Sequence, residues 1–88
     1  MAWLIHASGA TESVEIPASD SLDFMQQAVN GYIEVIPCDV QTDTHRYIHC
    51  IVNEEGIIQE LDPNMVASKM LDRPIVGTAI FLEADEMD

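Results

Sequence analysis

Basic residues are the scarcest charged residues in this chain. Arg46, Lys69 and Arg73 are its only arginines and lysines, against sixteen Asp and Glu residues, for a formal net charge of −13. Phosphate contacts from Lys and Arg dominate the affinity of proteins for nucleic acid. So few scattered bases exclude direct nucleic-acid binding, and the same negative charge repels anionic membranes.

A long apolar run is also missing. No run approaches the ~18–20 residues that are needed to cross a bilayer, and no basic residue precedes the short apolar run within residues 1–10. We therefore expect neither a membrane span nor a secretion signal. The expected location is cytoplasmic, which means the host cytoplasm if the chain is phage-encoded.

Cysteine and glycine are too few for several kinds of site. Two cysteines, Cys38 and Cys50, do not make a disulfide framework, and a reducing compartment predicts free thiols. A bridge between them stays an alternative if their strands pair. The four glycines do not cluster, which excludes a glycine-rich phosphate loop.

Metal-binding and catalytic patterns are absent as well. His45 and His49 are four residues apart in an extended segment, so about 13 Å separates them along a strand, too far to share one ion. Neither cysteine is followed by an activating helix start, and paired carboxylates mean little in so acidic a chain. We expect no metal site, no cofactor, no catalytic residue and no enzymatic activity.

What is present is enough for one folded domain. Apolar residues make up 48% of the 88-residue chain, which suits one modest core. We expect a single α+β domain over residues 1–82. Residues 83–88 are mostly acidic and show no apolar periodicity, which predicts a mobile acidic tail.

The first half of the chain predicts a hairpin followed by a helix. Residues 2–7 and 12–16 have strand patterns on either side of a turn. An amphipathic helix is expected over 21–30, begun by Asp20 or Ser21 and ended by a left-handed residue at Asn30–Gly31.

The middle of the chain predicts two strands and a tight hairpin. Residues 32–36 are β-branched and aromatic, and 46–52 alternate. Ile48, Cys50 and Val52 should be buried, while the face of Tyr47, His49 and Ile51 stays partly wet. The NEEG segment at 53–56 predicts a type I turn with a left-handed Gly56. Residues 57–60 would then be the returning strand.

The last third predicts a short helix and a buried strand. Asp62 is the expected cap of a helix over 63–70. Residues 75–82 are nearly all apolar, which is typical of a central strand, with Gly77 at a bulge or a close backbone approach. The predicted fold is therefore α+β, with a mixed or antiparallel sheet of about five to six strands, one main helix on one face and a short second helix.

Four short segments, in order, resemble a known family. GYIE at 31–34, VNEEG at 52–56, LDPN at 61–64 and IVG at 75–77 are similar to the GGYIE-like, VNEEG-like, LPPN-like and I-x-G segments of small domains of unknown function from bacteriophage, plasmid and bacterial genomes. Asn30 and Asp62 depart from the usual glycine and proline. The resemblance implies a small α+β fold and a mobile-element setting, and it implies no catalytic residue.

The charge suggests the leading hypothesis for function. A negative surface attracts basic protein surfaces, including grooves that bind nucleic acid. The hypothesis is a non-enzymatic module that docks on a basic surface of a host protein, such as a nucleic-acid-handling or defence protein, by charge mimicry. The candidate binding residues are the acids expected to be exposed: Glu12, Glu15, Asp20, Asp23, Glu54, Glu55, Asp85 and Glu86.

Three other interpretations stay open. The acids can simply keep the protein soluble or suit a salty habitat. A small-molecule or nucleotide-binding module would use the mixed face of Tyr32, Tyr47 and His49. A structural subunit would pair its edge strands with a second copy, giving a homodimer or a larger assembly.

Overall fold

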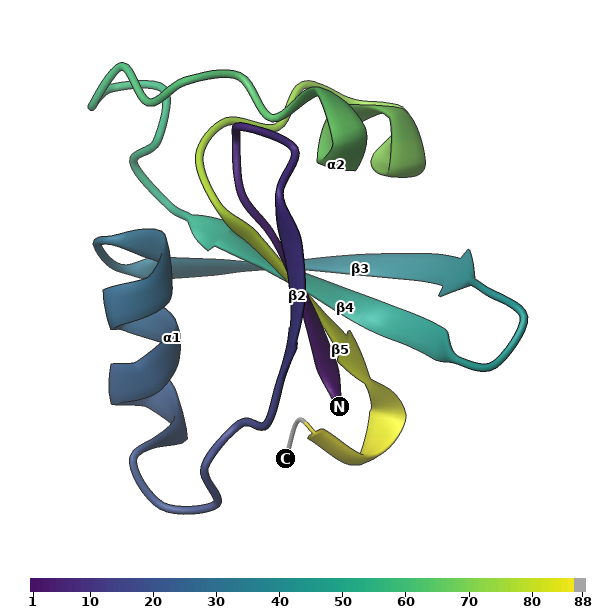
Figure 1. The fold of residues 1–88 in the computed structure, drawn as a ribbon. Coiled ribbons are helices and arrows are strands. Elements are labelled where there is room, and N and C mark those ends of the chain that lie inside the picture. The colour runs from purple at the N-terminus through teal and green to yellow at the C-terminus, as the bar shows by residue number, and fades with distance from the viewer. Residues whose placement is uncertain (87–88) are drawn as a thin grey trace.

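Five strands form one sheet in the computed structural model, which describes residues 1–86. They are β1 (Ala2–Ile5), β2 (Thr11–Val14), β3 (Ile33–Gln41), β4 (Arg46–Asn53) and β5 (Ala79–Glu83), in the spatial order β2-β1-β5-β4-β3 (Figure 1). Every pairing between neighbouring strands is antiparallel. The predicted α+β class is confirmed, and the sheet is antiparallel rather than mixed.

The two helices cover opposite faces of this sheet. α1 (Ser21–Val29) is the main helix, and α2 (Met65–Leu71) is the short second helix on the other side (Figure 1). Both helices were expected from the sequence. Within residues 1–86, no helix is long and apolar enough to span a membrane.

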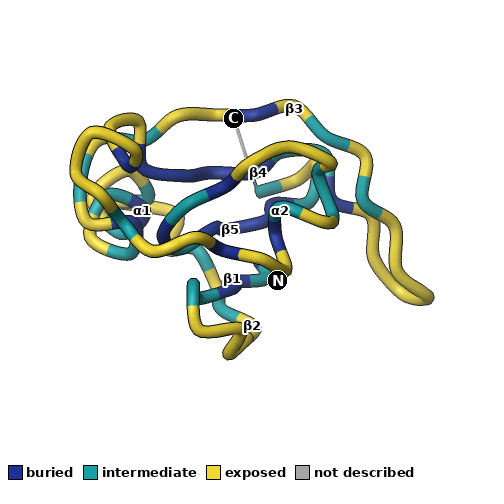
Figure 2. Tube along the Cα trace, turned by 90° about the horizontal axis from the view of Figure 1, so that it is seen from above, coloured by how far each residue is buried: buried dark blue, intermediate teal, exposed yellow. Residues whose placement is uncertain are grey.

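Each face of the sheet has its own core because side chains alternate along the strands. On the α1 side, Leu4, Ile51 and Ile80 pack with Met25 and Val29 of the helix. The α2 side holds Ile5, Cys50 and Phe81 together with Ala67 of α2, and Trp3, Tyr47 and Phe81 form an aromatic cluster there with ring centroids 5.7–6.3 Å apart. Figure 2 shows that burial is concentrated in the middle strands and that the connecting loops are exposed.

The central strand is the apolar one that the sequence predicts, although it is shorter. β5 lies in the middle of the sheet, and Ile80, Phe81 and Leu82 are fully buried. Residues 75–78 are not part of it. Only an isolated bridge joins Val76 to Pro63, and Gly77 has a positive φ of 74°.

The predicted burial of the two faces of β4 is wrong at Ile51, which is fully buried on the α1 side, and at the start of the strand. The register between β4 and β5 shifts between Tyr47 and His49. A bulge of this kind re-aims the side chains that precede it. Tyr47 therefore joins the buried core with 6% exposure, while Ile48, expected to be buried, is only partly so.

The predicted hairpin at NEEG is also wrong. Residues 54–60 form successive turns instead of a returning strand, and Gly56 does not adopt a positive φ. The left-handed residue of this loop is Glu60, with φ 56°. Asn53 does start the turn as expected, because its side-chain oxygen accepts a hydrogen bond from the Glu55 N–H at 2.7 Å.

α2 begins two residues later than predicted. Asn64, not Asp62, is its N-cap, and the Asn64 side chain accepts a hydrogen bond from the Ala67 N–H at 3.1 Å. Asp20 stands at the N-cap position of α1 but makes no side-chain cap bond there. The predicted left-handed stop at Asn30 is confirmed, with φ 64°.

The acidic end of the chain packs further into the fold than its composition suggests. Glu83 belongs to β5, and Ala84–Glu86 form a 3₁₀ turn, η1, that contacts β4. The Glu86 side chain accepts a hydrogen bond from the Glu83 N–H at 3.0 Å. Met87 and Asp88, the end of the predicted tail, lie outside the described residues.

Gly77 provides the first test of this arrangement. A Cβ at Gly77 would lie 2.8 Å from Leu61 Cδ1, in addition to the strain of its positive φ. Gly9 also has a positive φ, but a Cβ there would meet nothing within 4 Å. We expect Gly77→Ala to lower the free energy of unfolding by about 2–3 kcal/mol and Gly9→Ala by about 1 kcal/mol. Urea denaturation of both variants checks this, and equal losses would show that the contact with Leu61 is unimportant.

Candidate functional site

The candidate site is built around the 54–60 loop, which leaves the sheet at the end of β4. Asn53, the last residue of β4, is only 5% exposed, and its buried side chain forms hydrogen bonds that hold the loop in place. Its Nδ2 donates to Val29 O at 3.0 Å and to Asn30 O at 3.2 Å, both at the end of α1. The same amide donates to the Gln59 side chain at 3.1 Å. One buried side chain thus ties the loop to the helix.

Backbone hydrogen bonds hold the rest of the loop. The Glu54 N–H donates to Tyr32 O at 2.8 Å, the Gln59 N–H donates to Glu55 O at 2.9 Å, and the Leu61 N–H donates to Gly56 O at 3.0 Å. A loop whose polar groups are paired in this way has a defined shape before any partner arrives.

A cleft of about 240 Å³ lies between this loop and the segment that follows α2. Glu34 and Ile36 of β3 and Val52 of β4 form its floor, residues 53–58 form one wall, and residues 73–76 form the other. Three carboxylates, those of Glu34, Glu54 and Glu55, face one guanidinium, that of Arg73. The lining therefore carries an excess of negative charge.

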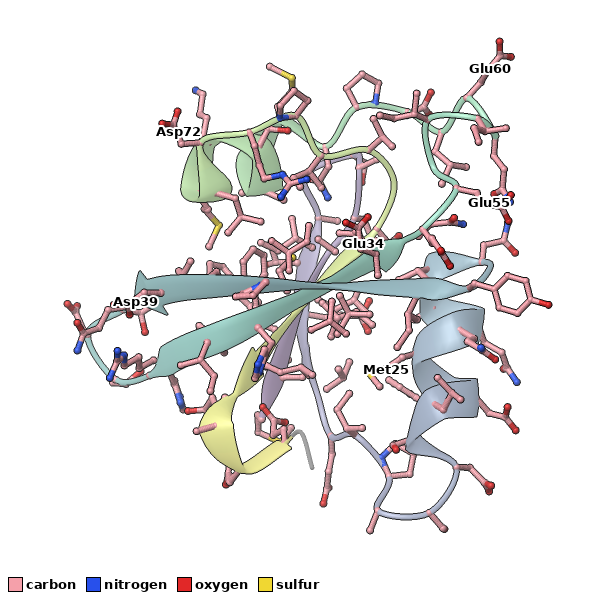
Figure 3. The ribbon with its side chains drawn as sticks, turned by 180° about the vertical axis from the view of Figure 1, so that it is seen from behind. Met25, Glu34, Asp39, Glu55, Glu60 and Asp72 are labelled. Carbon is pink, nitrogen blue, oxygen red and sulfur yellow. The ribbon has the colours of Figure 1, made fainter. Side chains whose placement is uncertain are left out.

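Two isoleucines beside these acidic residues project into solvent. Ile57 is 77% exposed and Ile58 is 80% exposed, and Tyr32, joined to the loop through its carbonyl, is 67% exposed. Side chains of this size are usually buried. We call the residues Glu34, Glu54, Glu55, Ile57 and Ile58, which all line the cleft, the isoleucine surface. Figure 3 shows Glu34 and Glu55 on the same side of the sheet as this loop.

Sequence reasoning found only part of the isoleucine surface. Glu54 and Glu55 were predicted binding residues, and both are exposed there. Ile57 and Ile58 were missed because they were assigned to a strand. The IIQE run does not alternate, which was a signal against a half-buried strand. Glu34 was assigned to a strand face, and nothing local to it predicts the approach of a loop twenty residues later.

The other predicted acids lie elsewhere, and several meet at a second cleft. Glu15, Asp85 and Glu86 line an open cleft of about 450 Å³ together with Met1 and Ser21. Asp20 and Asp23 belong to the same start of α1 as Ser21, and both are exposed. Glu12, on β2, pairs with His6 across 2.9 Å. The structure thus separates the eight predicted acids into different regions.

Part of the charge at the second cleft is already matched. Glu83 Oε2 lies 3.0 Å from the N-terminal amino group, and Glu83 Oε1 lies 2.8 Å from His45 Nδ1. The hydrogen bond with His45, and then the one with the amino group, lowers the pKa of the Glu83 carboxyl. Glu83, Asp85 and Glu86 have oxygens within 4.8 Å of one another, the one such group among residues 1–86 that could hold a metal ion. Exposed acids of this kind are common in acidic proteins, and two of these, Glu83 and Glu86, already lie 3.0 and 3.7 Å from the N-terminal amino group.

The residues of the alternative ligand site are not brought together. Tyr32 precedes Ile33, which pairs with Asn53, whereas Tyr47 pairs with Val40 near the far end of the same hairpin. Tyr47 is buried in the core on the α2 side. His49 lies on the strand between them, and its buried Nδ1 has no hydrogen-bond partner among residues 1–86.

The two cysteines are free thiols in one core region. Cys50 is fully buried, and partly buried Cys38 packs against the same cluster. Burial raises the pKa of the Cys50 thiol to about 12, and burial followed by the charge of Asp39 raises the pKa of Cys38. The thiolate is the reactive form, so both thiols should react more slowly at neutral pH than an unperturbed cysteine.

Alkylation checks this directly. At about pH 8, iodoacetamide should leave Cys50 unmodified and should modify Cys38 more slowly than an unstructured cysteine, whereas both should react in concentrated urea. Because the raised pKa belongs to the folded state, the stability contributed by the buried neutral Cys50 is complete below about pH 9. It is lost as the pH rises toward about 12. Rapid labelling of Cys50 in the native protein would contradict the packing.

Comparison with known proteins places the chain in a family without a described activity. The whole chain, residues 1–88, matches a family described as a domain of unknown function, DUF3846, and the chain belongs to that family. No curated protein and no solved structure matches the chain.

The segments that carry the sequence resemblance meet in the structure. A Cβ at Gly31 would lie 2.7 Å from Asn53 Nδ2, and a Cβ at Gly56 would lie 2.7 Å from Val76 Cγ2. Asn64 Nδ2 donates to Gly77 O at 2.8 Å and to Ile5 O at 2.9 Å. These residues fix the two walls of the cleft beneath the isoleucine surface. Their contacts are structural.

Proposed function

We propose that this chain is a non-enzymatic protein-binding domain that docks an acidic surface on a basic surface of another protein. One observation carries the proposal. Fifteen of the sixteen acidic residues lie within residues 1–86, and all of them except Glu83 and Glu86 are exposed. Internal pairing neutralises few of them. Asp39 pairs with Arg46 at 3.0 Å, and Glu12 faces His6.

The electrostatic attraction of such a surface extends far enough to guide a protein partner to it. Exposed charges interact across about 10 Å at 0.1 M salt, and electrostatic complementarity increases the rate of association. A basic groove that normally holds nucleic acid is the partner surface that fits best, because carboxylates can stand in for phosphates there. The resemblance to phage and plasmid domains supports a host protein of this kind, such as a nucleic-acid-handling or defence protein, as the target.

Self-assembly has less support from the structure. β3 is an edge strand, but Pro37 in its middle has no N–H to donate. A two-fold antiparallel pairing centred between Ile36 and Pro37 would place Glu34 opposite Asp39 of the second copy, and like charges directly opposite destabilise a sheet. Pairing of β3 with a second copy in this register is therefore unfavourable.

A salt-dependent pull-down tests the proposal. The tagged protein is incubated with nuclease-treated host lysate and washed at about 0.05 M or about 0.5 M KCl. We expect one basic protein to be retained at low salt, to persist after nuclease treatment, and to be lost at high salt. Retention that is unchanged at high salt, or recovery of no protein, would count against acidic docking and would favour solubility as the role of the charge.

A further inference from the structure

We propose that the isoleucine surface receives an extended basic segment of the partner that carries at least one large apolar side chain. This inference rests on the proposed function, because it names the site and the chemistry of the partner at that site. It is carried by the exposed isoleucines and the cleft beneath them. The negative charge of the surrounding carboxylates favours an apolar segment that also carries positive charge.

The apolar component comes first. Ile57 and Ile58 are adjacent in sequence, and both are more than three-quarters exposed. Hydrogen bonds hold both ends of the loop that displays them, since Asn53 accepts from the Glu55 N–H at its start and Gly56 O accepts from the Leu61 N–H at its end. An apolar patch displayed by a rigid loop favours association, since little conformational freedom is lost on binding.

Charge then selects the occupant. The cleft beside the isoleucines is lined by Glu34, Glu54 and Glu55 against Arg73 alone, and exposed Glu60 follows in the same loop. A second copy of this chain, with its net charge of −13, would bring carboxylates against carboxylates. Nucleic acid and anionic membranes carry the same sign. An arginine-containing segment is complementary, because guanidinium groups pair with carboxylates in a bidentate geometry.

The size of the cleft favours a protein segment over a small molecule. A volume of about 240 Å³ is smaller than the ~300–1,000 Å³ that is typical of small-molecule pockets, and the cleft is open. It can take one side chain of a longer segment while neighbouring residues lie over Ile57 and Ile58. An extended chain presents alternate side chains in two directions, so basic and apolar residues in alternation fit both parts of the surface.

Synthetic peptides provide the test. The probe is a peptide of about twelve residues that alternates arginine and leucine, compared with arginine–serine and glutamine–leucine peptides of equal length. NMR titration of the ¹⁵N-labelled protein should show shifts centred on residues 54–60, Tyr32 and Glu34. The Kd of the arginine–serine peptide should be about tenfold higher than that of the arginine–leucine peptide. The Kd of the glutamine–leucine peptide should be raised by at least the same factor.

Matched variants separate the two contributions. Ile57→Ser/Ile58→Ser and Glu34→Gln/Glu54→Gln/Glu55→Gln should each raise the Kd for the arginine–leucine peptide by about tenfold or more. Leu22→Ser/Met65→Ser changes exposed apolar residues elsewhere, and Asp43→Asn/Asp62→Asn/Asp72→Asn removes the same number of charges elsewhere. These controls should change the Kd by less than about threefold.

The outcomes distinguish this inference from the proposed function. Salt-sensitive binding that maps to other acids, or that the control variants weaken equally, would overturn the isoleucine surface and leave acidic docking standing. Absence of salt-sensitive binding to any arginine peptide, together with an empty pull-down, would overturn both. Binding that maps to residues 54–60 and fails in both test variants supports the inference.

Discussion

Replacing Asn64 with alanine should lower the free energy of unfolding by about 3–5 kcal/mol, the largest effect that we expect from any single substitution. Asn64 is fully buried, and its side chain donates to Ile5 O and Gly77 O and accepts from the Ala67 N–H. Alanine would remove the two hydrogen bonds to these buried carbonyls, at about 1–3 kcal/mol each, and the cap of α2, at about 1 kcal/mol. The total free energy of unfolding of a folded protein is only about 5–15 kcal/mol, so this loss is a large fraction of it.

The matched control is Asp62→Ala, two residues earlier. Asp62 is exposed, and only its backbone carbonyl is used, as acceptor of the Gly77 N–H at 2.7 Å. Its removal should change stability by less than about 0.5 kcal/mol. Urea unfolding followed by the fluorescence of Trp3, the single tryptophan, measures both variants. A loss below about 1 kcal/mol for Asn64→Ala would show that the three hydrogen bonds do not hold the structure together.

The second large effect is a coupling between Gly31 and Asn53. A methyl group at Gly31 would lie 2.7 Å from the Asn53 amide, so Gly31→Ala must displace that amide from its acceptors. Gly31 does not have a positive φ, so this clash, and not backbone strain, sets the penalty. We expect Gly31→Ala and Asn53→Ala to cost about 2–4 kcal/mol each. The double variant should cost about 1–2 kcal/mol less than their sum, because the methyl then occupies the space of the missing amide.

A second cycle provides the control for this coupling. A Cβ at Gly77 would meet Leu61 and no atom of Asn53, so Gly77→Ala and Asn53→Ala should be additive within about 0.5 kcal/mol. Additivity in both cycles would contradict the close packing of Gly31 on Asn53. Hydrogen exchange extends the test to the site, since loss of the Asn53 amide should increase exchange at the Glu55 N–H, which it now holds.

The fold could be predicted from the sequence wherever neighbouring residues alone determine the local conformation. The apolar run that becomes β5, the left-handed Asn30 and the amphipathic α1 each follow from neighbouring residues alone. The predictions were wrong where contacts between residues far apart in the sequence determine the conformation. Asn64 displaces Asp62 as the cap of α2 because Asn64 can also reach Ile5 and Gly77, and no local pattern contains that information.

The candidate site was harder to predict than the fold for a related reason. Asn53 is predicted from the sequence only as the first residue of a turn, but its side chain reaches back 23 and 24 residues to the end of α1. That long-range bond turns residues 54–60 away from the sheet and leaves Ile57 and Ile58 outside. The acids could be listed from the sequence, whereas the structure was needed to show which acids surround an exposed apolar group.

The dissociation constant of the captured partner, measured as a function of salt, tests the central claim most directly. Fluorescence anisotropy from about 50 to about 500 mM KCl, on the wild type and on Glu34→Gln/Glu54→Gln/Glu55→Gln, provides the comparison. We predict that the wild-type Kd rises by about tenfold or more across this range and that the triple variant shows a flatter dependence. A wild-type Kd that stays constant with salt would contradict recognition by the acidic surface.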